Sequence, residues 1–111
     1  MANVDYVTIR GASLADALAA LKAAADVTKV VERPRSTTLL NSDERVELSA
    51  SPRSWEPDTI VVEVYLGGSE EEQLALSRRV YDYLVENTDW DVELDSDNAE
   101  DTIASRIRAT T

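Results

Sequence analysis

Three stretches of the chain carry the hydrophobic patterns of β-strands. Residues 4–10 are rich in β-branched and aromatic side chains and end at Gly11, which predicts a first strand. Residues 59–66 form the most apolar run of the chain. A strand whose two faces are both mostly apolar is expected near the middle of a sheet. In residues 90–95, hydrophobic side chains alternate strictly with acidic ones. This alternation predicts a further strand whose acidic side chains lie in solvent.

Two other stretches repeat their hydrophobic residues at helical spacing. Residues 14–26 carry one apolar stripe and follow Ser13, a residue type that caps helix N-termini. Residues 70–86 follow Ser69, and Glu72 lies three positions after that serine. This spacing is a capping box, in which the serine and the glutamate each satisfy a backbone N–H at the start of the helix. The pattern therefore predicts two amphipathic helices.

The segment between the two helices predicts short strands joined by turns. Residues 27–33 are predicted to be an edge strand or a connection, because Pro34 lacks a backbone donor and favours an extended residue before it. Residues 37–40 and 45–50 are separated by turn-forming residues, so we predict a hairpin with one face exposed to solvent. Residues 51–58 contain two prolines and two serines and are predicted to form a loop.

The order of these elements predicts the fold class. A short helix is expected at 99–108, where Ile103 and Ile107 are the large apolar residues. The elements then run strand, helix, hairpin, strand, helix, strand, helix. This order predicts a single α+β domain over residues 1–111, which is the usual length of one domain. We expect a ferredoxin-like two-layer sandwich, with a mainly antiparallel sheet, two long helices on one face and a short C-terminal helix.

The charge of the chain is strongly negative and unevenly placed. The formal net charge is −11, and residues 58–111 hold 4 Lys or Arg against 14 Asp or Glu. Such a surface repels phosphate backbones, so a nucleic-acid partner is not expected, whereas a basic protein would be attracted. A second interpretation is that the acidity reflects the composition of a salt-adapted host or serves solubility.

The residue types that are missing exclude several kinds of catalysis. The sequence has no Cys and no His, so chemistry that depends on a thiol, an imidazole or a transition metal is not expected. Acidic residues between Asp89 and Glu100 imitate the spacing of a calcium-binding loop, but Leu94 occupies the position that requires glycine. We therefore predict no enzyme activity, no catalytic residue, no cofactor and no metal site.

The sequence also favours one compartment. A chain without Cys forms no disulfide, which is typical of a reducing environment. No apolar run approaches the roughly 20 residues that span a bilayer, and the N-terminal residues lack the pattern of a signal peptide. A cytoplasmic location without a membrane partner is predicted.

A two-layer domain leaves one face of its sheet uncovered, and that face is the predicted binding surface. Tyrosines among charged residues are typical of interaction surfaces. Two alternatives are that the C-terminal helix folds back over this face, or that the face is plain solvated sheet. Trp55, between two prolines, is either an anchor for a partner or a lid over the edge of the core. The predicted partner-binding residues are Tyr6, Arg10, Glu63, Tyr65, Asp91, Glu93 and Trp55.

These observations favour a non-enzymatic acidic protein-binding domain. It would act like an inhibitor, an immunity factor or an antitoxin, or it would assemble with copies of itself. The alternative is a small-molecule or ion-sensing regulatory domain, with a pocket between copies or one lined by Arg10, Arg45 and Tyr65. In the simplest account of Glu63, its carboxylate pairs with Arg10 or Arg45 across the sheet.

Overall fold

The computed structural model describes residues 4–25, 27–34, 36–40, 46–53, 56–67, 69–96 and 102–107. Within these ranges the chain forms seven strands and two helices. In chain order they are β1 (Asp5–Arg10), α1 (Leu14–Ala24), β2 (Lys29–Glu32), β3 (Thr37–Leu40), β4 (Val46–Arg53), β5 (Glu56–Leu66), α2 (Glu70–Asn87), β6 (Asp91–Ser96) and β7 (Ala104–Arg106).

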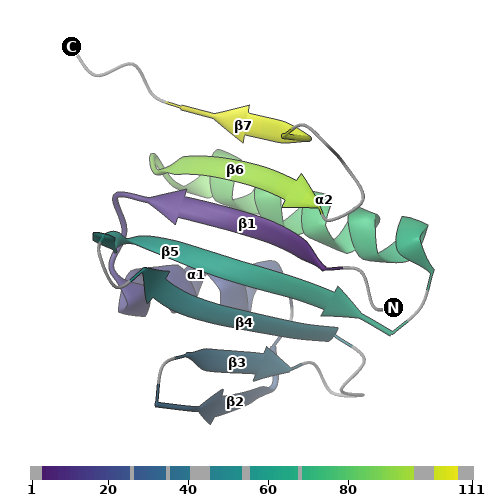
Figure 1. Cartoon of the computed structure of the whole chain (residues 1–111), viewed down its shortest axis with the longest axis horizontal. Helices are drawn as coiled ribbons and strands as arrows, with labels where there is room; N and C mark the ends of the chain where they lie inside the picture. Colours follow the sequence, from purple (N-terminus) through teal and green to yellow (C-terminus); the bar gives the residue numbers. More distant parts are fainter. Residues whose placement is uncertain are drawn as a thin grey trace.

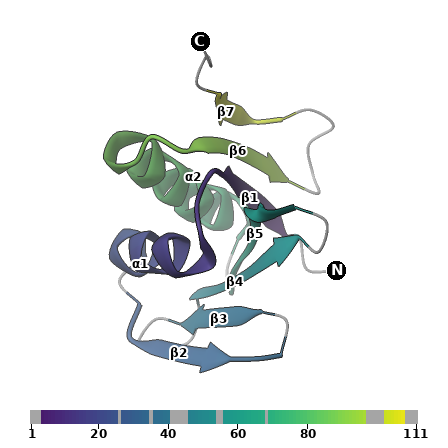
Figure 2. The same cartoon turned by 90° about the vertical axis from the view of Figure 1, so that its left-hand side faces the viewer.

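The strands form one antiparallel sheet in the order β2-β3-β4-β5-β1-β6-β7, with β5 near its middle (Figure 1). The two helices contact each other on one face of this sheet, and no helix of the described residues covers the other face (Figure 2). α1 packs against β4 and β5, whereas α2 packs against β1, β5 and β6. The prediction that residues 59–66 form a strand near the middle of the sheet is confirmed.

Both helices begin at the predicted serine caps. The Ser13 side chain accepts a hydrogen bond from Asp16 N at 3.2 Å, and the Ser69 side chain accepts one from Glu72 N at 3.1 Å. Each bond satisfies a backbone donor that the first helical turn leaves without a partner. The observed bounds, Leu14–Ala24 and Glu70–Asn87, agree with the predicted helices to within two residues.

The core lies between the helices and the sheet and consists mainly of aliphatic side chains. Successive side chains of a strand alternate between faces, and most of the side chains that the central strands point towards the helices are buried. Burying one such side chain contributes about 1.5–3 kcal/mol. The largest fully buried side chains are Ile9, Leu21, Leu39, Leu48, Ile60, Leu84, Leu94, Val7, Val62, Val64, Val80 and Val92.

The predicted loop over residues 51–58 is wrong. β4 continues to Arg53 and β5 begins at Glu56, so most of this segment belongs to a strand pair. Proline is tolerated in a strand where no neighbouring strand needs its missing donor. The β3–β4 ladder ends at the pair Thr37–Ala50, so Pro52 lies beyond the end of β3.

The predicted C-terminal helix is also wrong for the residues that the structure describes. Residues 104–106 form the edge strand β7, which pairs with β6. The Arg106 side chain reaches from β7 to the C-terminal end of α2 and the turn that follows. It donates to Val85 O (3.1 Å), Thr88 O (2.9 Å) and Trp90 O (2.6 and 3.2 Å). The last turn of α2 has no basic residue of its own, so Arg106 supplies the positive charge that the end of a helix favours.

The ferredoxin-like fold is therefore a wrong prediction. The chain builds a seven-stranded sheet, not a sandwich with two long helices and a third helix at the C-terminus. The β2–β3 hairpin extends the sheet at one edge and β7 extends it at the other. A chain with this balance of strands and helices is still a mixture of α and β structure.

Neither helix in the described ranges combines the length and the apolar character that crossing a membrane requires.

Candidate functional site

The face of the sheet opposite the helices is the candidate site, and strand alternation fixes its members. In β1, Val7 and Ile9 are fully buried towards the helices, so Tyr6, Thr8 and Arg10 point the other way. The register extends this assignment to the neighbouring strands. On the four central strands, the described side chains of the open face are those of Tyr6, Thr8, Arg10, Glu47, Ser49, Ser51, Thr59, Val61, Glu63, Tyr65, Asp91, Glu93 and Asp95.

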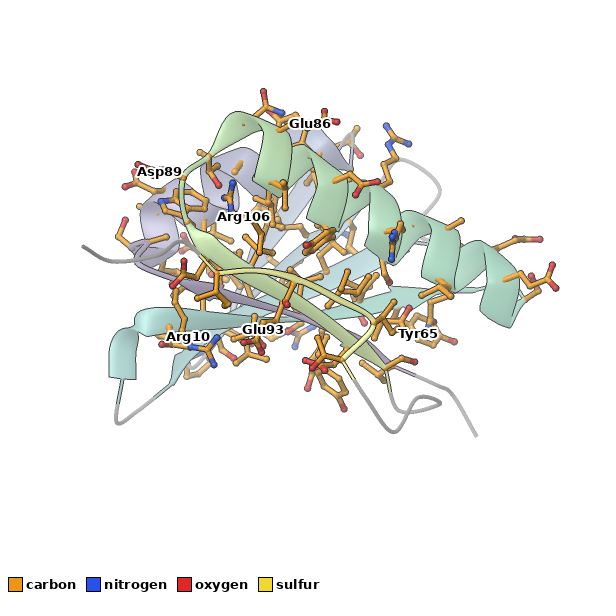
Figure 3. All side chains as sticks on the ribbon, turned by 90° about the horizontal axis from the view of Figure 1, so that it is seen from above. Arg10, Tyr65, Glu86, Asp89, Glu93 and Arg106 are labelled. Atoms are coloured by element: carbon orange, nitrogen blue, oxygen red, sulfur yellow. The ribbon has the colours of Figure 1, made fainter. Side chains whose placement is uncertain are left out.

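Six of the seven predicted partner-binding residues lie on the open face. Figure 3 shows Arg10, Glu93 and Tyr65 on the side of the strands away from α2, whereas Glu86 and Asp89 lie on the helix side. Tyr6, Glu63 and Asp91 join them through the strand register. Trp55, the seventh, lies outside the described residues.

Each of the two tyrosines stands opposite carboxylates. Tyr6 lies directly between Glu63 of β5 and Asp95 of β6, because it pairs with both in the sheet. Tyr65 pairs with Glu47 of β4 and is 40% exposed. Directly opposite residues on one face of an antiparallel pair have Cβ atoms about 5 Å apart. The open face therefore presents aromatic rings bordered by hydrogen-bond acceptors.

An ion pair is described on the open face, and it is not the predicted one. Arg10 Nη1 lies 3.0 Å from Glu93 Oε1, with the two side chains 36% and 28% exposed. Glu63 is opposite Tyr6 and Ser49 instead, so the expected pair between Arg10 and Glu63 does not form. Arg45, the other expected partner, lies outside the described residues. An exposed pair of this kind contributes about 0–1 kcal/mol.

On the four central strands, the described side chains of the open face carry a negative net charge. They include five carboxylates, on Glu47, Glu63, Asp91, Glu93 and Asp95, against the single guanidinium of Arg10. Carboxylates accept charge-assisted hydrogen bonds from Lys and Arg, which are about twice as strong as neutral ones. The arrangement is thus suited to a positively charged surface.

Small residues form the floor of the open face. Thr8 is 5% exposed and Thr59 is 3% exposed although both point away from the helices. Thr8 pairs with Val61 of β5 and with Glu93 of β6, so larger side chains flank it in the sheet. The tyrosine and carboxylate side chains are therefore the groups that a flat partner would meet first.

The pocket expected for a regulatory ligand is not built from Arg10 and Tyr65. Arg10 pairs with Thr59, and Tyr65 lies six residues further along the same strand. At about 3.3 Å per residue, the two positions are about 20 Å apart. They lie towards opposite ends of the open face.

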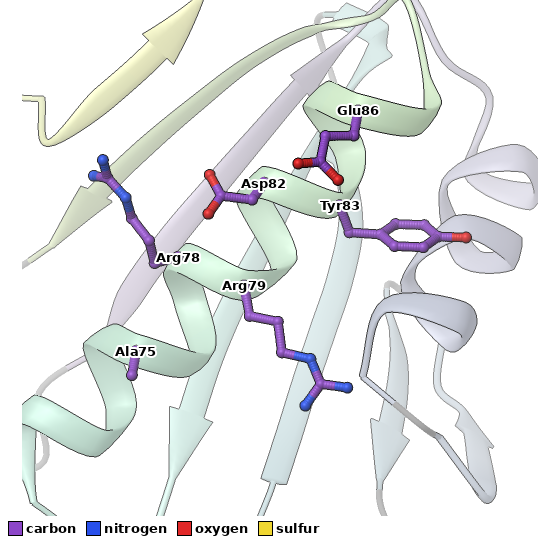
Figure 4. A pocket seen from close by; sticks show the side chains of 6 residues that line it. All are labelled: Ala75, Arg78, Arg79, Asp82, Tyr83 and Glu86. Carbon is purple, nitrogen blue, oxygen red and sulfur yellow. The ribbon is translucent and has the colours of Figure 1, made fainter.

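The helix side of the molecule has a shallow hollow along the outer surface of α2. Figure 4 shows that the Tyr83 ring points towards α1, whereas Arg78 and Asp82 point away from it. Within the described ranges, no three Asp or Glu side chains are grouped so as to hold a metal ion. The hollow is lined by Ala75, Arg78, Arg79, Asp82, Tyr83 and Glu86.

Two details of the structure were not predicted from the sequence, one on the open face and one at the edge of the sheet. Asp95 shares the open face with Asp91 and Glu93, and the strict alternation of β6 was the signal that could have included it. Arg106 had no such signal, because an arginine in a polar C-terminal segment is typical of an ordinary surface charge. Its role depends on α2 ending close to β7, which only the tertiary structure shows.

Comparison of the sequence with models of known protein families gave no match, and comparison with curated proteins gave none either.

Proposed function

We propose that this protein is a non-enzymatic binding module that recognises a basic protein through its open face. The observation that carries the proposal is the placement of five carboxylates and two tyrosines, with the guanidinium of Arg10, among the described side chains that the four central strands present on the side that no described helix covers. Such a module fits the role of an inhibitor, an immunity factor or an antitoxin.

The tyrosines are the proposed anchors of the interface. A tyrosine offers a large contact area with few rotatable bonds and a hydroxyl that forms hydrogen bonds, and tyrosine is enriched among residues whose truncation costs 2 kcal/mol or more in binding. Tyr65 is already 40% exposed in the isolated chain. A partner that covers it removes apolar ring surface from water, which favours binding.

The carboxylates supply the proposed selectivity for a basic partner. Complementary charge raises the rate of encounter and suppresses wrong partners more than it adds affinity. At physiological ionic strength the screening length is about 8 Å, so the open face attracts a partner mainly at short range. Association should slow as salt is raised.

The proposal includes a cytoplasmic location. It rests on the lack of any cysteine in the sequence, since small binding domains of oxidising compartments commonly depend on disulfides. A partner that is synthesised in the same compartment would meet the open face without export.

Site-specific photo-crosslinking tests the proposal. A photoreactive amino acid replaces Tyr65 on the open face in one variant and Leu74 on α2 in the other, since these side chains are 40% and 39% exposed. Both variants are activated in a lysate of the source organism. We expect position 65 to crosslink to one basic protein, with a yield that falls in 0.5 M salt, whereas position 74 does not. Equal crosslinking of that protein from both positions would contradict the proposal.

A further inference from the structure

The edge strand β2 carries backbone groups that have no neighbouring strand among the described residues. β2 is the last strand of the sheet on its side and pairs with β3 alone. Arg33 N donates to Ser36 O at 2.8 Å, which fixes the phase of the antiparallel ladder. Backbone groups alternate in direction along a strand, so Lys29 and Val31 bond towards β3, whereas the N–H and C=O groups of Val30 and Glu32 point outwards.

An exposed side chain marks the same edge. Val30 is 42% exposed, which makes it one of the few large hydrophobic residues at the surface of the described chain. It pairs with the fully buried Leu39 of β3, so it lies on the helix side of the sheet at the end of the hydrophobic layer. Outward backbone groups beside an apolar side chain form a template for another strand.

We propose that β2 pairs with β2 of a second copy of this chain, which joins two sheets into one continuous antiparallel sheet. Two copies related by symmetry across an antiparallel junction have their two-fold axis perpendicular to the sheet. Each residue of β2 then lies opposite a residue of the second copy whose side chain is on the same face of the sheet. The axis then passes through Val30 or through Val31. This inference does not rest on the function proposed for the open face.

Charge and packing select the axis at Val30. With that axis, Val30 faces Val30 of the second copy, and Lys29 faces Val31. With the axis at Val31, Lys29 would face Arg33 of the second copy, and like charges directly opposite each other are destabilising. The outward N–H and C=O groups of Val30 find partners in either arrangement, at Val30 of the second copy with the first axis and at Glu32 with the second, so the side chains decide between the two axes.

The distribution of charge permits two copies to meet at this edge. Residues 1–57 contain 7 Lys or Arg against 8 Asp or Glu, whereas residues 58–111 contain 4 against 14. β2 lies at the opposite side of the sheet from the acidic strand β6 (Figure 1). Five strand spacings separate β2 from β6, or about 24 Å, which exceeds the screening length of about 8 Å. Repulsion between the acidic regions is therefore weak in the proposed dimer.

Single cysteine variants test both the dimer and its axis, because the natural chain has no cysteine. Directly opposite residues that exchange hydrogen bonds have Cα atoms about 5.5 Å apart, which lies within the range of a disulfide. We expect Val30→Cys to form a disulfide-linked dimer in a glutathione redox buffer at least tenfold faster than Val31→Cys and Leu74→Cys. Crosslinking of Val31→Cys faster than Val30→Cys would overturn the proposed axis.

Sedimentation of chains without cysteine provides the second measurement. The unmodified chain should sediment as a dimer at 100 μM, and Val30→Pro should sediment as a monomer with an unchanged circular dichroism spectrum. Proline at this position removes an outward donor and leaves the ladder to β3 intact. A monomeric unmodified chain at 1 mM, together with equal crosslinking of Val30→Cys and Leu74→Cys, would overturn the proposal.

Discussion

The two faces of the sheet are built from the same strands, yet they differ in almost every physical respect. In β6, Val92 and Leu94 are fully buried beneath the helices, whereas Asp91 and Glu93 alternate with them on the open face. The covered face is aliphatic, and the open face is acidic and aromatic. The comparison shows that stability and recognition can be assigned to alternate residues of one strand.

The magnitudes support this division. A fully buried aliphatic side chain contributes about 1.5–3 kcal/mol through burial, whereas an exposed ion pair such as that of Arg10 and Glu93 contributes about 0–1 kcal/mol. Substitutions on the covered face should therefore change the free energy of unfolding, and substitutions on the open face should leave it almost unchanged. Each prediction below tests one part of this difference.

The largest effect is expected for Leu94→Ala on the covered face. Leu94 is fully buried, so removal of its side chain leaves a cavity in the core and should lower the free energy of unfolding by about 2–5 kcal/mol. The control is Asp95→Ala, one residue further along β6, which should change it by less than about 0.5 kcal/mol. Urea denaturation measures both, and equal effects would refute the assignment of the two faces.

Ser77→Ala should lower the free energy of unfolding by less than Leu94→Ala. It removes the hydroxyl that donates a hydrogen bond to the carboxylate of Asp5 in β1, on the covered face. Asp5 is 2% exposed, and its Oδ2 lies 2.6 Å from Ser77 Oγ. Loss of the hydroxyl leaves that oxygen without this donor, which should cost about 1–3 kcal/mol. The exposed Ser105 serves as the control through Ser105→Ala. Thermal unfolding compares the two, and a Ser77→Ala variant as stable as the parent would show that the bond adds nothing.

Arg106→Ala should have a local effect at the edge of the sheet. The side chain donates to three backbone carbonyls at the end of α2, so its loss should release β7 before the rest of the sheet unfolds. The measurement is hydrogen exchange at Ile103 N, which donates to Leu94 O at 2.8 Å. We expect exchange about tenfold faster or more in the variant, with core amides unchanged.

In the same experiment, Arg106→Lys tests whether the positive charge at residue 106 is sufficient or whether the planar guanidinium is needed. Lysine keeps the positive charge near the helix end but lacks the planar fork that reaches several acceptors at once. Exchange at Ile103 N should therefore lie between that of the parent and that of Arg106→Ala. Unchanged exchange in both variants would mean that β7 is held by its pairing with β6 alone.

Local signals in the sequence were sufficient for both helices and for the central strands. Ser13 and Ser69 cap the helices as their positions predict, and the alternation in residues 90–95 corresponds to β6. Alternation within each strand also indicates on which face of its own strand Tyr6, Arg10 or Glu93 lies. These features depend only on residues close together in the chain, which is why one sequence reveals them.

The wrong predictions all depended on contacts between distant residues. Pro52 predicts a loop, but the β3–β4 ladder ends before Pro52, so proline is tolerated at this position of β4. The local pattern of residues 99–108 predicts a helix, but β6 pairs with β7 and the end of α2 accepts hydrogen bonds from Arg106. β2 is an edge strand, which is one of the two alternatives predicted for residues 27–33, but its pairing with β3 is a contact that the local pattern does not show. The ferredoxin-like prediction failed because the sheet has seven strands and because β7 forms where part of a C-terminal helix is expected.

The most direct test of recognition through the open face uses the partner protein that photo-crosslinking identifies. Its Kd is measured for two variants of this chain that carry the same change in charge at different places. Glu63→Lys changes an exposed carboxylate on β5, and Asp82→Lys makes the same change in charge on α2, away from the open face. We expect Glu63→Lys to raise Kd at least tenfold with no change in unfolding temperature, and Asp82→Lys to change Kd by less than about twofold. An equal rise in Kd for the two variants would contradict recognition through the open face.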